Sequence, residues 1–217
     1  MSSSTANASS TKKAPRNYPK DSPETRASKQ LAYLLRHGAL EKGLKLRDDG
    51  SILVSEVLKY PQLKSITFAQ LQNIVDTNDK KRFALYEDAE DKQWYIRAVQ
   101  GHSIGIKEPG LKKLDALTVP ACVVHGTRRE LVPVIEEKGL SKMGRTHIHF
   151  ATGLAKEEGV ISGMRNSANA FIYIDSKRAI ADGVEFFMSD NGVVLSKGLD
   201  DSGILPAKYF ERIEYRK

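Results

Sequence analysis

The spacing of apolar residues changes about halfway along this 217-residue chain, and the change limits the folds that it can adopt. Between residues 28 and 79, apolar residues recur every three or four positions, as on one buried helical face, in the segments SKQLAYLLRHG, VSEVLKY and TFAQLQNIVDTND. Residues 82–99, RFALYEDAEDKQWYIRAV, alternate on both sides of an acidic turn, which is typical of a β-hairpin. Three helices followed by a hairpin is the order of a winged-helix module.

In the second half of the chain, the pattern of apolar residues is different. A stretch with glycine and proline, KEPGLKKLDALTVP, is expected to join two lobes. After it, RRELVPVIEEKGL has helical spacing, whereas the strand-like segments are short and read ACVVHGT, THIHFAT, AFIYID and NGVVLS. We therefore predict an α+β fold, with a winged-helix-like lobe in residues 25–108 and a β-rich lobe with one early helix in residues 109–217.

Composition excludes several classes of protein. Hydrophobic residues make up 40% of the chain, which is enough for a folded core. No run approaches the roughly 18 apolar residues of a membrane span, and the polar N-terminus lacks the apolar core of a secretory signal. The single cysteine, Cys122, excludes an internal disulfide and fits a reducing compartment. We expect a protein inside the cell, cytoplasmic, nuclear or both, and no interaction with a membrane.

The formal charge is +7, and more than half of it lies in the first 30 residues. Residues 1–24 are rich in serine, alanine, lysine and proline without an apolar period, so we predict a disordered basic leader. The remaining charge leaves a mildly basic folded body. Such a body is compatible with a polyanionic partner such as nucleic acid.

Arginine and histidine stand side by side at the end of the first helical segment. Arg36 and His37 have a simple explanation, because cations near a helix C-terminus are favoured by the helix dipole. A second explanation takes in Arg82, which opens the hairpin, and Arg165, which precedes a strand. Three guanidinium groups from separate elements match the oxygens of a phosphate. His37 titrates near neutrality and could exchange a proton there.

The second half offers a possible nucleotide site. His125, Gly126 and Thr127 lie between a strand and a helix, where glycine permits close approach and the helix N-terminus favours a pyrophosphate. His147 and His149 form a His-x-His pair that raises a zinc site as an alternative, although no carboxylate or cysteine lies at a matching spacing. There is no Walker-type loop and no glycine fingerprint of the dinucleotide-binding folds.

Eight segments together resemble the RNA 2′-phosphotransferases, the NAD-dependent enzymes that complete tRNA splicing. In chain order they are SKQLAYLLRHG, NDKKRFAL, IRAVQGHSI, VVHGT, GLSKMGRTHIHFA, GVISGMR, FIYID and NGVVL. The resemblance covers about residues 28–210, and ISGMR and ILPAKYF look like the eukaryotic branch. It implies a winged-helix-like N-terminal lobe and a C-terminal lobe of the ADP-ribosyltransferase fold, meeting around the substrate.

The resemblance also implies a two-step reaction on 2′-phosphorylated RNA such as spliced tRNA. The internal 2′-phosphate attacks the nicotinamide ribose of NAD and expels nicotinamide. The neighbouring 2″-hydroxyl then attacks phosphorus, releasing the RNA and ADP-ribose 1″,2″-cyclic phosphate. The family's essential Arg-His-Arg-Arg set falls on Arg36, His37, Arg82 and Arg165, with the arginines holding the phosphate and His37 carrying protons.

For NAD, the resemblance implies contacts in the second lobe, by His125, Gly126, Thr127, Arg145, His149 and Asn191. Val193 stands where many transferases of this fold have a catalytic glutamate, which suits a nucleophile that is already an anion. Gln100 and His102 are expected to brace the lobes, with RNA contact as the alternative. No metal is implied, and a monomer is expected.

Two other functions stay open. An ADP-ribosyltransferase acting on nucleic-acid terminal phosphates would need only the first step and would leave ADP-ribose attached. A non-catalytic RNA-binding module built on the winged helix would bind 2′-phosphorylated RNA without consuming NAD. Under the leading hypothesis, an Arg165→Ala variant is expected to stall after the first step and accumulate the RNA–ADP-ribose adduct.

Overall fold

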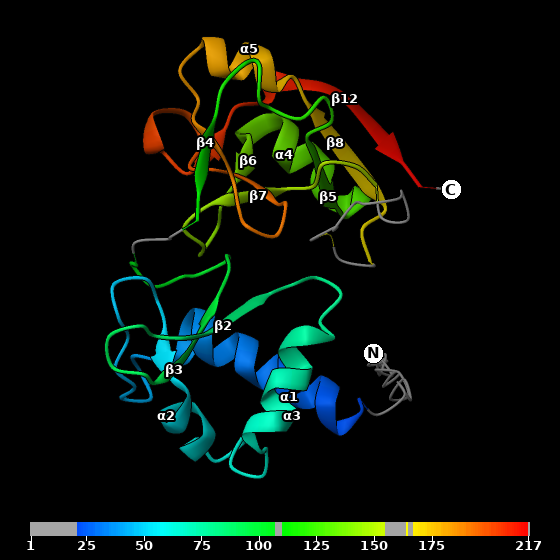
Figure 1. Ribbon diagram of the computed structural model, residues 1–217. Helices are drawn as coiled ribbons and strands as arrows, with labels where there is room; N and C mark the ends of the chain where they lie inside the picture. Colours follow the sequence, from blue (N-terminus) through cyan, green and yellow to red (C-terminus); the bar gives the residue numbers. More distant parts are fainter. Residues whose placement is uncertain (1–20, 107–109, 155–163, 165–166, 217) are drawn as a thin grey trace, which may run out of the picture.

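The computed structural model describes residues 21–106, 110–154, 164 and 167–216 of the chain. It is an α+β structure whose helices and strands gather into two lobes, drawn one above the other in Figure 1. Buried apolar side chains form one cluster between residues 27 and 98 and two clusters between residues 114 and 213. Each lobe therefore has hydrophobic packing of its own.

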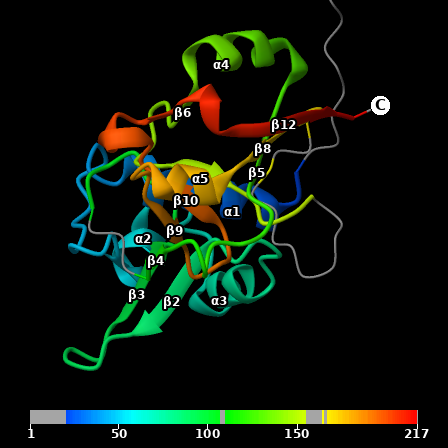
Figure 2. The same ribbon diagram turned by 90° about the horizontal axis from the view of Figure 1, so that it is seen from above.

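The first lobe combines three short helices with a small sheet. Its elements are α1 (Pro23–Tyr33), the π-helical turn η1 (Leu34–Gly38), β1 (Ile52–Leu53), α2 (Val54–Lys59), α3 (Phe68–Asp76), β2 (Phe83–Glu87) and β3 (Trp94–Ala98). The sheet is antiparallel with the strand order β1-β3-β2. Pairing of Phe83 with Ala98 and of Glu87 with Trp94 confirms the predicted hairpin. Its tip extends past the rest of the molecule in Figure 2.

Local capping fixes where the helices of this lobe begin. The Ser22 hydroxyl accepts a hydrogen bond from the amide of Thr25 at 3.2 Å, and Pro23 occupies the first turn of α1, where proline is favoured. At α3, the Thr67 hydroxyl and the Gln70 side chain form a reciprocal capping box. The first helix thus starts at Pro23, inside the predicted leader, of which residues 1–20 lie outside the described part of the chain.

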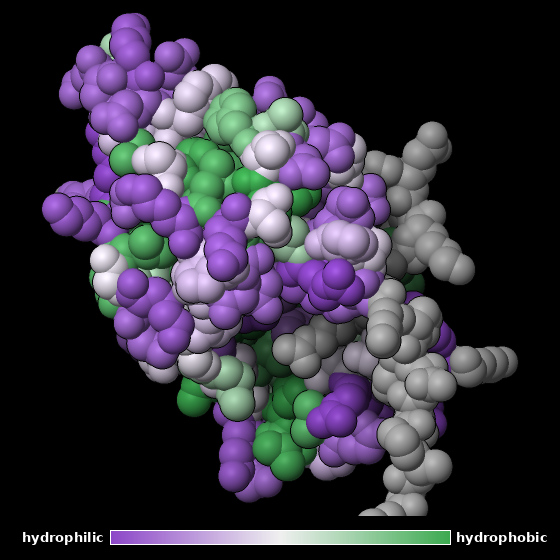
Figure 3. Space-filling model, turned by 90° about the horizontal axis from the view of Figure 1, so that it is seen from below, coloured by the Kyte–Doolittle hydropathy of each residue, from purple (hydrophilic) through white to green (hydrophobic). Residues whose placement is uncertain are grey.

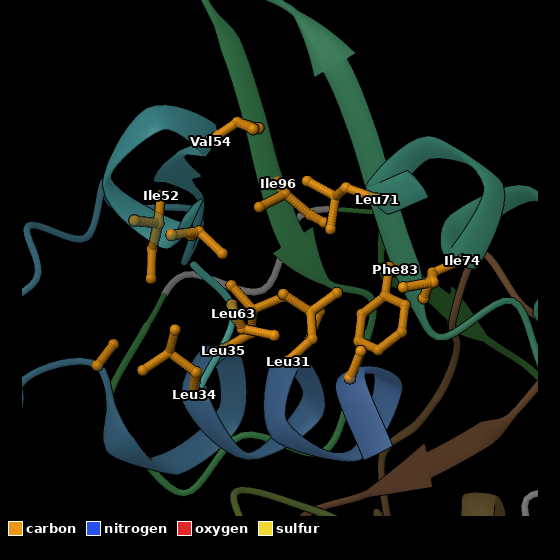
Figure 4. Close-up of a cluster of buried hydrophobic side chains, with 14 residues drawn as sticks. Leu31, Leu34, Leu35, Ile52, Val54, Leu63, Leu71, Ile74, Phe83 and Ile96 are labelled. Atoms are coloured by element: carbon orange, nitrogen blue, oxygen red, sulfur yellow. The ribbon is translucent and has the colours of Figure 1, made fainter. Parts of the chain in front are cut away.

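The predicted apolar face of the first helix is the centre of the first core. Leu31, Leu34 and Leu35 are fully buried, and Figure 4 shows them opposite Phe83 of β2 and Ile96 of β3. Burying a leucine side chain stabilises a protein by roughly 1.5–3 kcal/mol. This face therefore fixes the helix on the hairpin, and with it the residues that follow Leu35.

The second lobe is built mainly from short antiparallel strands. Its elements are β4 (Lys112–Leu114), β5 (Val124–Thr127), η2 (Arg129–Leu131), α4 (Val132–Lys138), β6 (Leu140–Ser141), β7 (Ile148–Phe150), β8 (Ala170–Ile174), α5 (Ser176–Ala181), β9 (Phe186–Met188), β10 (Val194–Ser196), η3 (Leu199–Asp201), β11 (Ile204–Leu205), η4 (Ala207–Tyr209) and β12 (Phe210–Tyr215). Two larger sheets have the orders β4-β9-β10-β7 and β12-β8-β5. A bridge between Val124 and Ala151 links them next to the histidine-bearing strands.

The expectation of a single helix in this lobe was wrong, because α5 is a second one. Asp175 caps it by accepting a hydrogen bond from the amide of Arg178 at 3.0 Å. With six residues, α5 is too short to show a helical period in the sequence. The predicted strands near residues 124, 148, 170 and 194 are confirmed.

No helix in the described ranges is long and apolar enough to cross a membrane. Seen from below, the surface is largely hydrophilic, with hydrophobic areas between the charged side chains (Figure 3).

One glycine in the second lobe is needed for its backbone conformation. Gly198 has φ +85° and ψ −172°, which only glycine adopts readily, and an added Cβ would lie 2.5 Å from the backbone of Ile204. We expect Gly198→Ala to lower the free energy of unfolding by about 3 kcal/mol, measured by urea denaturation. Gly183 is the matched control, with φ +93° but nothing within 4 Å of an added Cβ. Equal losses in the two variants would contradict the steric explanation.

Candidate functional site

The candidate site starts at η1, the π-helical turn that directly follows α1. Turns of this kind are rare and occur frequently at functional sites. Within this five-residue turn, Leu34 and Leu35 pack into the first core, whereas Arg36 and His37 lie outside it. The turn therefore places the predicted Arg-His pair at the edge of the first lobe.

Gly38 is the last residue of η1, but the backbone stays helical beyond it. The next residue, Ala39, keeps helical angles of φ −57° and ψ −48°, and the amide of Lys42 donates to the carbonyl of Gly38 at 3.0 Å. The first left-handed glycine comes later, at Gly43 with φ +71°. An added Cβ at Gly38 would lie 2.7 Å from the ring of Tyr33, so glycine is needed here for packing.

The guanidinium group of Arg36 is buried beside other cations. Its Nε and Nη2 atoms have no hydrogen-bond partner among the described residues. Burial, followed by the charges of Arg82 and Arg145, lowers the pKa of Arg36 from its ordinary value to about 10. A buried cation without a carboxylate partner is costly. The arrangement is suited to an anion that would supply the missing acceptors.

His37 lies next to this group and is held through one ring nitrogen. Its Nδ1 and the hydroxyl of Ser103 are 2.9 Å apart, and the amide of Ser103 donates to the carbonyl of Arg36 at 3.0 Å. Partial burial, and then the charges of Arg36, Arg145 and His102, lower the pKa of His37 from its ordinary value. The imidazole is therefore neutral at pH 7 and able to accept a proton.

Arg82 reaches the same region from the loop before β2. Its amide and its Nη1 atom both approach the Asn78 side-chain oxygen, at 3.2 and 3.5 Å. Burial lowers the pKa of Arg82, and the neighbouring carboxylate of Asp79 partly opposes this shift. The charge of Arg82 also lowers the pKa of Arg36, so these two guanidinium groups lie within electrostatic reach of each other.

The second lobe meets this cluster at Gly101. An added Cβ at Gly101 would lie 3.5 Å from Nε of Arg36 and 3.6 Å from Nε2 of His149. His149 also hydrogen-bonds the side-chain amide of Gln100 at 2.7 Å, and the amide of Thr146 donates to the carbonyl of His102 at 3.0 Å. The expectation that Gln100 and His102 brace the two lobes is confirmed.

His125 and His149 are held as neutral rings in the second lobe. The Nδ1 atom of His125 is 2.9 Å from the carbonyl of His149, and that of His149 is 2.9 Å from the carbonyl of His147. Burial and then the charge of Arg145 lower the pKa of His149 to about 3, and burial lowers that of His125. The other ring nitrogen of His149, Nε2, lies 2.7 Å from Oε1 of Gln100.

The other predicted contacts differ in their placement. Arg145 is exposed, and its charge acts on Arg36, His37 and both neutral histidines. Gly126 and Thr127 lie on β5, where an added Cβ at Gly126 would be 2.4 Å from the Met164 sulfur. Asn191 is buried and bound to the first lobe instead of lining this cluster. Arg165 lies outside the described residues.

The zinc alternative finds no support in the described ranges, where no three histidine, cysteine or acidic side chains are grouped to hold a metal ion. His147 is buried, with its Nδ1 atom 3.1 Å from the Thr146 hydroxyl and its ring against Phe187.

An open cavity of about 530 Å³ adjoins Arg82 in the first lobe. It lies between α1 and the segment that leads from α3 to β2, and is lined by Glu24, Thr25, Ser28, Lys29, Ala32, Ile74, Thr77, Asn78, Asp79, Lys80 and Arg82.

Asn78 and Ser103, which hold Arg82 and His37, were not singled out from the sequence. Neither residue type carries a local signal for a contact with a distant arginine or histidine.

A cationic cluster with neutral imidazoles, contributed by both lobes, defines an anion-binding protein equipped for proton transfer. A sequence model of the family described as RNA 2′-phosphotransferase, Tpt1 / KptA family, matches residues 22–198, so the chain belongs to this family.

Several relatives are similar over most of this chain. A tRNA 2′-phosphotransferase 1 of Danio rerio is 43% identical over 93% of this chain and 90% of its own length, and one of Homo sapiens is 41% identical over 94% and 81%. A Schizosaccharomyces pombe relative, also described as a tRNA 2′-phosphotransferase, is 49% identical over 86% of this chain. The chain spans 50% of the length of that relative.

Proposed function

We propose that this protein is an NAD-dependent RNA 2′-phosphotransferase that removes the internal 2′-phosphate from spliced tRNA. The observation that carries the proposal is the buried Arg36 guanidinium, which has two nitrogen atoms without acceptors among the described residues. The charges of Arg82 and Arg145 add to the same region. A doubly charged phosphate supplies both the acceptors and the opposite charge that these groups require. Family membership supports the same substrate class.

The second lobe has the features that an NAD site requires. Arg145 adds positive charge for a pyrophosphate, His125 and His149 are neutral donors or acceptors, and Gly126 lies beside His125 on β5, where the Met164 side chain packs against it. When bound, NAD supplies an electrophilic ribose carbon and a leaving nicotinamide. Thr127, which follows Gly126 on β5, completes the proposed set.

The residues have distinct roles in the proposed reaction. Arg36, Arg82 and Arg165 hold the 2′-phosphate, which forms the RNA-phospho-ADP-ribose intermediate as nicotinamide leaves. In the second step, neutral His37 takes the proton of the attacking 2″-hydroxyl and returns it to the departing 2′-oxygen of the RNA, while the arginines offset the growing charge on phosphorus. The products are RNA with a free 2′-hydroxyl and ADP-ribose 1″,2″-cyclic phosphate. Neither step calls for a metal ion.

The proposed architecture follows from the order of the elements. The first lobe has the order of a winged helix, with α1, β1, α2 and α3 followed by the β2–β3 hairpin. Two packed antiparallel sheets in the second lobe support an ADP-ribosyltransferase-like fold. We propose that the lobes comprise residues 23–108 and 109–217, since α1 begins at Pro23, and that the protein acts as a monomer.

The test uses a short RNA that carries one radiolabelled internal 2′-phosphate, incubated with the full chain with and without NAD. Release of the label as ADP-ribose cyclic phosphate only with NAD is the expected result. Label retained on an RNA of increased mass would favour an ADP-ribosyltransferase. Tight binding with no NAD consumption would favour an RNA-binding module. The same RNA without the 2′-phosphate is the control.

A further inference from the structure

The loop that carries Arg82 is held by the second lobe, and this contact has no place in the roles assigned above. The loop spans residues 78–82, between α3 and β2. On the other side, the turn between β9 and β10 spans residues 189–193. Asn191, in this turn, has only 4% of its surface exposed although it is a polar residue. A polar side chain buried to this extent needs partners for both ends of its amide.

Both ends of the Asn191 amide have partners. Its Oδ1 atom lies 2.9 Å from the hydroxyl of Ser189, within the same turn. This contact leaves the NH₂ group facing the first lobe, where Nδ2 donates to the carbonyl of Lys80 at 3.0 Å. The amide therefore joins residues 111 positions apart in the sequence, and its orientation is fixed by chemistry at both ends.

The carbonyl that Asn191 holds is two residues before Arg82. The other carbonyls around it also have partners: Asn78 accepts from the amide of Lys81 at 2.8 Å, and Arg82 from the amide of Val99 at 2.9 Å. Lys81 adopts φ +40°, an unusual conformation for a residue with a side chain. Such a conformation persists only where surrounding contacts enforce it.

A second asparagine holds the loop from the side of the first lobe. Asn78 accepts from the amide of Arg82 at 3.2 Å, and its own NH₂ group reaches the hydroxyl of Ser28 on α1 at 3.5 Å. The loop is thus held between α1 and the second lobe. Lys80 adds a contact to the second lobe, since its Nζ atom donates to the carbonyl of Met164 at 3.2 Å.

We propose that Asn191 is a positioning residue, which fixes Arg82 against the phosphate by holding the carbonyl of Lys80, and that it does not contact NAD. This rests on the proposed function. A displacement of about 1 Å in a catalytic group can cost up to 10²-fold in rate. Because the contact joins the two lobes, the position of Arg82 also depends on the position of the second lobe relative to the first.

The test compares Asn191→Ala with Asp190→Asn in the full chain. Asp190 is in the same turn and also contacts the first lobe, through Arg97 of β3 at 3.4 Å, but it does not hold the loop. For Asn191→Ala we expect kcat for 2′-phosphate removal to fall roughly 10- to 100-fold, with KM for NAD changed less than about threefold. Asp190→Asn should keep kcat within about twofold.

A second variant keeps the test informative if Asn191→Ala misfolds. Asn78→Ala loosens the same loop from its other side, so it should show the same fall in kcat with KM for NAD unchanged. A rise in KM for NAD with kcat preserved in Asn191→Ala would make Asn191 a direct NAD contact and overturn the proposal. An equal loss of kcat in Asp190→Asn would also overturn it, because lobe contact in general would then be the cause.

The wild-type protein, assayed in the same series, separates this proposal from the function on which it rests. If the wild type releases the 2′-phosphate with NAD but Asn191→Ala does so at the same rate, only the positioning role fails. If the wild type itself shows no NAD-dependent release, the proposed function fails and the positioning role fails with it.

Discussion

Replacing Arg36 by methionine is expected to abolish most 2′-phosphate removal while leaving the folded protein at least as stable as the wild type. The rate should fall by at least 10²- to 10³-fold, roughly the cost of removing one preorganised donor to a developing anion. Stability should not fall with it, because the Arg36 side chain is buried beside Arg82 and Arg145 with two nitrogen atoms unpaired among the described residues. Methionine fills a similar volume without the charge.

The sign of the stability change follows from the pKa of Arg36. The folded state lowers this pKa from its ordinary value to about 10, so the folded protein binds the Arg36 proton less tightly than the unfolded chain does. Near pH 7 the charge therefore costs the folded state free energy, of the order of 3 kcal/mol. The penalty is relieved only as the pH rises above the lowered pKa. Arg36→Met removes it at neutral pH.

A matched control is available at Arg47. This arginine pairs with the carboxylate of Asp88 at 2.6 Å and lies over the ring of Tyr95, and the bond to Asp88 raises its pKa. Arg47→Met should leave the rate unchanged and slightly lower the melting temperature, the opposite of Arg36→Met in both respects. Thermal melts and single-turnover rates measure the two effects. A melting temperature several degrees lower for Arg36→Met would show that Arg36 stabilises the fold.

Local patterns in the sequence were sufficient to predict the main helices and strands of the fold. Leu31, Leu34 and Leu35 recur at the spacing of a buried helical face, and all three are buried. The hairpin was predicted because apolar and polar residues alternate in both of its strands, on either side of an acidic turn, and few other structures have this pattern. The sequence could not distinguish a π turn from an α turn at Leu34–Gly38. The two differ by one residue in hydrogen-bond spacing, which the apolar spacing of so short a segment does not resolve.

The candidate site residues were singled out because their motifs resemble a known family, since from the residues alone the helix dipole also explained Arg36 and His37. The contacts that position these residues were not predicted. Asn191 was assigned to NAD from its motif, whereas its amide is bound to the carbonyl of Lys80. Contacts between residues so far apart depend on how the two lobes pack. No periodicity or local motif encodes them.

The second large effect is expected at His37, and it should appear in the pH dependence of the reaction. The His37 pKa is lowered by partial burial and by the charges of Arg36, Arg145 and His102. A base works in its neutral form, so the rate should be constant above the lowered pKa. It should fall only as the pH drops through that value, below the ordinary pKa of about 6.5 for histidine.

A His37→Gln variant should reduce kcat by about 10²- to 10⁴-fold and remove the acidic limb of the pH profile, because glutamine cannot take up the proton.

The titration of His37 can also be followed directly by NMR of the imidazole protons, with His37→Gln identifying its signal. In Arg36→Met the loss of one neighbouring charge should move this titration upward, toward the ordinary value. An acidic limb that survives in His37→Gln would assign the proton transfer to another group. The same shift in pKa means that the folded state loses stability as the pH falls through the unfolded value, since the unfolded chain then binds the proton more readily.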